Sequence, residues 1–97
     1  MINPGWRAFE RYTFSPAVRR GNFIFVSGMT ATDDAGNLVG TDLATQTRHI
    51  LTKLQKVLAE AGATMDDVMM TTDYITTTEG YRETADVRRE FWKNGFP

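Results

Sequence analysis

The hydrophobic and polar positions between residues 42 and 61 alternate with the period of an α-helix. Apolar positions recur every three or four residues and form one stripe, which consists of Leu43, Thr47, Ile50, Leu51, Leu54, Val57, Leu58 and Ala61. This spacing places one apolar face along a helix. Thr41 or Asp42 is suited to cap the start, and Gly62 stands where a glycine commonly follows a helix. The pattern therefore predicts a long helix over residues 42–61.

A β-hairpin is predicted upstream of this helix. Residues 23–27 begin with Phe-Ile-Phe-Val, the aromatic and β-branched composition of a buried strand. A Gly-Asn turn joins them to a strand at residues 17–19. Gly28 follows the second strand directly, and we expect its backbone to need a positive φ or a close approach to another segment. A buried strand that ends at Ser27 and Gly28 favours a small-molecule pocket at this corner.

Two further elements follow the long helix. Residues 68–76 are rich in Thr, Tyr, Ile and Val and predict a strand, whose poor alternation is typical of a strand covered on both faces. A capping box over residues 64–67 predicts a single helical turn before it. Residues 79–93 predict a second helix, which ends near Gly95 and Pro97. The order strand, strand, helix, strand, helix favours an α+β fold with helices packed on one face of a mixed sheet.

Length and composition narrow the class of protein. A chain of 97 residues forms one domain, and we expect residues 1–10 to lie on it as an arm through Trp6 and Phe9. A domain this small is marginally stable alone, which favours an oligomer. The formal charge of −1 gives no general field for nucleic acid or membrane, and the chain has no cysteine. No apolar run approaches the length of a membrane span, so we expect a cytoplasmic protein.

The sequence gives no sign of a metal or cofactor site. His49 is the only histidine, and we expect it on the exposed outer face of the long helix with no second ligand nearby. Residues 33–37 faintly resemble a calcium loop. They lack alternating ligands, and Ala44 stands where a closing Glu is required. We therefore expect neither metal nor cofactor.

Several stretches together resemble the RidA/YjgF family of reactive-intermediate (imine/enamine) deaminases. The first is the SPAVRRGNFIFVSG stretch at residues 15–28, which is similar to the family's opening hairpin. The others follow in the family's order: residues 42–47, 60–63, 67–68, 71–72 and 91–97. The likeness covers residues 11–97 and implies a chorismate-mutase-like α+β fold. It also implies imine or enamine hydrolysis without a cofactor, at pockets between the subunits of a homotrimer.

The resemblance also assigns expected roles to five residues. Ser27 and Gly28 match the family's pocket floor, although a hydroxyl that only satisfies local backbone groups is the plainer interpretation of Ser27. Ala17 stands where we match a pocket tyrosine, and Ala85 where we match a pocket asparagine, which indicates a diverged paralogue with an altered pocket. Arg88 replaces an aromatic residue. Its guanidinium is a candidate ligand for a carboxylate. Alternatively, its aliphatic stem packs along the helix while the guanidinium reaches solvent or an acidic residue.

In the family, further strands follow the Phe-Pro that here is Phe96-Pro97, and they carry the catalytic Arg and Glu. Neither residue has a counterpart in this chain, so its catalytic residues are unknown. We expect the domain to be C-terminally incomplete; supply of the strands from elsewhere, or loss of the chemistry, are the alternatives. The sequence thus supports two functions: a RidA-like deaminase, or a non-catalytic ligand-binding or interaction protein on the same trimeric scaffold.

Overall fold

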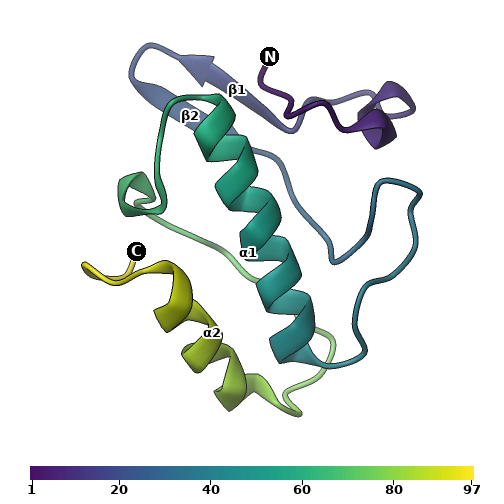
Figure 1. Cartoon of the computed structure of the whole chain (residues 1–97), viewed down its shortest axis with the longest axis vertical. Helices are drawn as coiled ribbons and strands as arrows, with labels where there is room; N and C mark the ends of the chain where they lie inside the picture. The colour runs from purple at the N-terminus through teal and green to yellow at the C-terminus, as the bar shows by residue number, and fades with distance from the viewer.

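A computed structural model describes residues 1–97 as two helices beside a small sheet (Figure 1). Strand β1, Ala17–Arg20, pairs antiparallel with β2, Phe23–Val26. Helix α1, Leu43–Glu60, lies at the centre, and α2, Thr84–Phe91, packs along it. Three short 3-10 turns complete the order: Arg7–Glu10, Met65–Asp67 and Tyr81–Glu83. The loop of residues 27–42 and the N-terminal arm lie on the opposite side of α1 from α2 (Figure 1).

The hairpin confirms the prediction to within one residue at each strand end. Ala17 pairs with Val26 and Arg20 with Phe23, so the strands turn at Gly21 and Asn22. Gly21 has a φ of 57°, which a glycine adopts without strain. The arm adds one bridge at the edge of the sheet, because the backbone N–H of Ile2 donates to the carbonyl of Ala17 at 2.8 Å.

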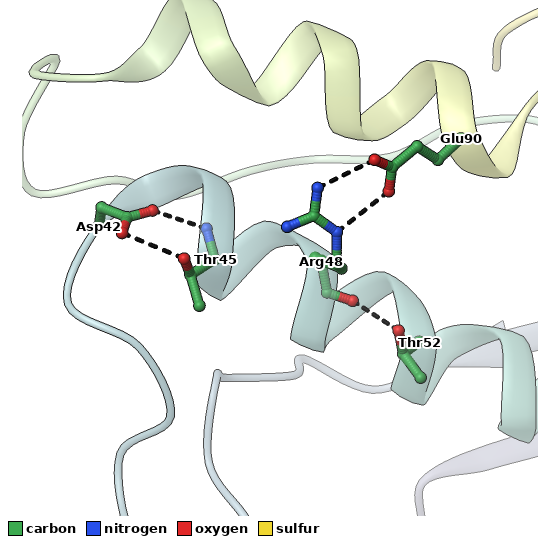
Figure 2. A network of polar contacts seen from close by, with 5 residues as sticks. All are labelled: Asp42, Thr45, Arg48, Thr52 and Glu90. Atoms are coloured by element: carbon green, nitrogen blue, oxygen red, sulfur yellow. Dashed lines mark hydrogen bonds and ion pairs between the residues drawn. The ribbon is translucent and has the colours of Figure 1, made fainter.

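Helix α1 begins at the expected cap. The carboxylate of Asp42 accepts the backbone N–H of Thr45 at 2.7 Å and its hydroxyl at 3.1 Å (Figure 2). These hydrogen bonds favour the ionised carboxylate, and they lower the pKa of Asp42 below its ordinary value. One turn further along, Arg48 forms a two-bonded ion pair with Glu90 of α2, with Nε–Oε2 and Nη2–Oε1 distances of 3.0 and 2.9 Å (Figure 2). Both side chains are about half exposed, so this pair orients the helices more than it stabilises them.

The hydrophobic core lies between the two helices and the Met65–Asp67 turn. Leu51 and Leu58 of α1 meet Val87 of α2, together with Met65 and Trp92, and all five side chains are buried. The indole N–H of Trp92 donates to the carbonyl of Met65 at 2.7 Å. The Met65–Asp67 turn also has the predicted capping box, in which Thr64 and Asp67 exchange hydrogen bonds. This turn is therefore held at both its start and its end.

Three expectations about regular structure are corrected. The helix expected over residues 79–93 is shorter, because Gly80 has a left-handed φ of 75° and Trp92 is already extended. The strand expected over residues 68–76 does not form: the sheet holds only β1 and β2, and a strand requires a neighbour for its backbone groups. Strand β2 was expected to be buried, yet Phe23 and Phe25 are 56% and 60% exposed, since no element of the chain covers that face.

A single carboxylate fastens the N-terminal arm to the loop of residues 27–42. Asp34 accepts the backbone N–H groups of Arg7 at 2.9 Å and Ala8 at 2.7 Å. These hydrogen bonds favour the ionised form, so they lower the pKa of Asp34 below its ordinary value of 3.8. The arm is thus held by a group whose charge depends on pH.

We expect the arm to detach in acid. The pKa of Asp34 is lower in the folded protein than its ordinary value of 3.8. The carboxylate therefore contributes its full stabilisation above pH 3.8, and this contribution is lost as the pH falls through the folded-state pKa. Substitution Asp34→Ala should give the same detachment at neutral pH. Amide hydrogen exchange at Arg7 and Ala8 measures it. Asp66→Ala, which removes a carboxylate that contacts Asn94 instead, is the matched control, and equal protection in both variants would contradict the assignment.

Candidate functional site

The end of the hairpin is fixed by Ser27. Its backbone N–H donates to the carbonyl of Pro16 at 2.9 Å, and its Oγ donates to the carbonyl of Ser15 at 2.6 Å. The hydroxyl therefore satisfies a local backbone group, as the plainer interpretation expected. A hydroxyl donates once but can accept through two lone pairs. Ser27 Oγ is half-buried and keeps the capacity to accept a hydrogen bond from a ligand.

Gly28 does not behave as expected. Its φ is not positive, and a Cβ built on it would meet no atom within 4 Å. The residue is exposed, so the expectation that its backbone needs a positive φ or a close approach to another segment is wrong for the chain as it stands. What Gly28 does instead is border a hollow.

The hollow has a volume of about 470 Å³ and lies between the N-terminal arm, the start of the loop of residues 27–42 and helix α1. This volume falls within the range of small-molecule sites. Residues 9–14, at the end of the arm and just after it, contribute an aromatic wall in which the rings of Tyr12 and Phe14 stack parallel at 5.3 Å, while both stand edge-on to Phe9. The other lining residues are Trp6, Ala8, Gly28, Met29, Thr30, Thr32, Asp33, Asp34, His49, Lys53 and Lys56.

Two polar side chains of α1 bind the loop backbone inside the hollow. Lys53 donates to the carbonyls of Thr30 at 2.9 Å and Thr32 at 3.2 Å, and its ammonium lies 5.6 Å from the centre of the Trp6 ring. Partial burial lowers the pKa of Lys53. His49 was expected to be exposed, but it is half-buried and its Nε2 lies 3.0 Å from the carbonyl of Thr32. Because a carbonyl only accepts, this Nε2 carries the proton.

The remaining sequence-predicted residues lie outside the hollow. Ala17 is 1% exposed within the hairpin and presents no surface to a ligand. Arg88 and Ala85 are on α2, on the far side of α1 (Figure 1). Arg88 pairs with Asp73 through Nη2 and Oδ2 at 3.0 Å, and its Nη1 donates to Thr84 at 2.8 Å. Its head thus reaches an acidic residue.

Of the five residues, the structure places only Gly28 in the hollow. Sequence reasoning missed the aromatic wall. A signal was present, since four aromatic residues fall within nine positions: Trp6, Phe9, Tyr12 and Phe14. Nothing local indicated that this segment would fold against the loop.

No three His, Cys, Asp or Glu side chains lie close enough together to hold a metal ion. No helix combines the length and the apolar character needed to cross a membrane.

Comparison with known proteins gives consistent matches. Residues 7–97 match the protein family described as endoribonuclease L-PSP. A RutC family protein of Pyrococcus abyssi is 32% identical over 87% of this chain and 67% of its own length. The crystal structure of a YjgF-family protein from Mycobacterium tuberculosis is 32% identical, with a TM-score of 0.77 over 97% of this chain and 74% of that one. The structure of protein YjgH is 27% identical, with a TM-score of 0.86 over 99% and 76%. These likenesses confirm the α+β fold expected from the sequence.

Proposed function

Because the chain belongs to the RidA/YjgF family, we propose that it is a hydrolase that deaminates small reactive imines or enamines at pockets between the subunits of a homotrimer. The whole chain forms one domain of this type, with residues 1–10 as an arm. We propose further that the domain is completed by strands beyond those seen here.

The Ser27 corner is the observation that carries this proposal. Imine hydrolysis requires a bound C=N group, a water that attacks its carbon, and a proton for the nitrogen. Ser27 Oγ is held by the carbonyl of Ser15 and keeps free lone pairs, so it can accept the N–H of an iminium. The adjacent Gly28 has no side chain to obstruct the approach. The chain thus supplies binding and orientation, and no residue of it is assigned as the acid or base.

Exposed apolar surface supports the homotrimer. Phe23 and Phe25 lie exposed on β2, and the segment of residues 68–76 exposes Met69, Met70 and Tyr74 at 74%, 79% and 94%. Large apolar side chains exposed in such number favour an interface with another chain. A second subunit over β2 would also provide the missing wall of a pocket at the Ser27 corner.

A non-catalytic function is the second candidate. The Asp73–Arg88 ion pair favours it, because Arg88 is the candidate to bind a substrate carboxylate and its guanidinium is already paired with Asp73. Ala17 and Ala85 add no polar group where a catalytic pocket would need one.

The net charge of −1 gives no support to the ribonuclease activity in the family's description. Without cysteine the chain needs no oxidising compartment to form disulfides, and we propose that it is cytoplasmic.

The deaminase proposal predicts faster loss of 2-iminopropionate in an assay that couples an amino-acid oxidase to imine capture by semicarbazide. We expect Ser27→Ala to lower any rate by about tenfold or more, since it removes one positioned hydrogen-bonding group. Ser15→Ala keeps the Ser15 carbonyl that holds the hydroxyl, and serves as the control. If the correctly folded protein does not accelerate the loss of imine, the non-catalytic function is favoured. Acceleration unaffected by Ser27→Ala would remove the corner from the mechanism.

A further inference from the structure

The hollow beside the N-terminal arm differs in its chemistry and its position from the Ser27 corner. It shares Gly28 with that corner, but Ser27, Ala85 and Arg88 do not line it. Its walls come from residues 6–14, from the start of the loop of residues 27–42, and from His49, Lys53 and Lys56 of α1. The hollow therefore requires its own explanation.

The aromatic wall leaves a large apolar surface uncovered. Tyr12 and Phe14 are 44% and 51% exposed although their rings stack on each other and contact Phe9. Aromatic rings pack well against a further flat ring, in offset or edge-to-face geometry. The apolar part of the hollow thus suits a planar aromatic group.

The charged side chains of the hollow are not equally available. Asp34 accepts two backbone N–H groups from the arm, and Asp33 accepts those of Ala35 and Asn37. Lys53 is bound to two loop carbonyls. Lys56 has neither a hydrogen bond nor an ion pair, and it is exposed at the rim one turn after Lys53. The one unengaged charge in the hollow is therefore positive.

From this arrangement we propose that the hollow is a binding site for a small aromatic carboxylate. Its ring lies against Tyr12 and Phe14, and its carboxylate pairs with the ammonium of Lys56. The site is separate from the pocket proposed for imines and does not depend on it. Occupancy would also hold residues 12–14, which directly follow the arm, against α1, because the ligand contacts both.

The probe for this proposal is 3-phenylpropionate, titrated by calorimetry against the folded protein. Two analogues vary the charge on the same ring: the neutral 3-phenylpropanamide and the cationic 3-phenylpropylamine. We expect the acid to bind about tenfold or more tightly than either analogue, since only it forms a charge-assisted hydrogen bond with Lys56. An amine that binds as tightly as the acid would overturn the proposal, because Asp33 and Asp34 would then determine the ligand's charge.

Matched variants localise the binding. Lys56→Met removes the ammonium and keeps a long side chain. It should lower the affinity for 3-phenylpropionate about tenfold and leave the affinity for 3-phenylpropanamide unchanged. Lys93→Met, at a distant exposed lysine, should leave both affinities unchanged. Phe14→Ala should lower the affinities for the acid and the amide by the same factor. Ser27→Ala and Arg88→Met should have no effect; loss of binding in either would place the ligand outside the hollow and refute the proposal.

Discussion

Replacing Trp92 with alanine should lower the free energy of unfolding by about 3–5 kcal/mol. Its indole is 3% exposed and packs among Leu51, Leu58 and Val87 where the two helices meet. Truncation leaves a cavity between the two helices that the surrounding side chains fill only in part. It also removes one of the two donors to the carbonyl of Met65, which keeps only the backbone N–H of Val68 at 3.2 Å. Since small domains are stable by only about 5–15 kcal/mol, we expect most of the cooperative transition to be lost.

Urea denaturation followed by circular dichroism measures this loss, and two substitutions separate its causes. Trp92→Phe keeps most of the apolar volume and removes the N–H, so it should cost about 1–3 kcal/mol. Trp6→Phe changes the chain's other tryptophan, which is half-buried in the arm, and should cost much less. Equal losses for the changes at residues 92 and 6 would show that the helix contact is not the centre of the core.

The elements that sequence predicted well are those determined by neighbouring residues. The long helix begins at its Asp42 cap, and the Thr64–Asp67 capping box forms as expected. The hairpin turns at Gly21, where the Gly-Asn pair indicated it. Each of these features depends on contacts within a few positions, so the local pattern contains the required information.

The elements that were mispredicted depend on partners distant in sequence. Residues 68–76 have strand composition, but composition does not supply a neighbouring strand. Phe23 and Phe25 have the character of buried residues, but burial requires a cover that the chain does not provide. For the same reason the hollow was not predicted: it exists because Asp34 binds the backbone of residues more than 25 positions earlier.

The apolar face of β2 leads to the second large effect that we expect. Phe25→Asp should convert the proposed homotrimer to monomer at micromolar concentration. Phe23 and Phe25 are two positions apart on one face of the strand, with ring centres 6.3 Å apart. In an oligomer closed over this face, the substitution loses about 2 kcal/mol of apolar burial and adds a charge that must stay solvated. Every subunit carries the change, so the penalty applies at each interface of the ring.

Light scattering coupled to gel filtration distinguishes the outcomes. The unmodified protein should elute at three times the chain mass, and Phe25→Asp at the mass of one chain. Leu38→Asp is the matched control, because Leu38 is 67% exposed but lies in the loop of residues 27–42, away from the β2 face. It introduces the same charge at a similarly exposed apolar position, so it should leave the oligomer intact. A trimer that survives both Phe23→Asp and Phe25→Asp would place the interface elsewhere, and an unmodified protein that runs as a monomer would refute the homotrimer itself.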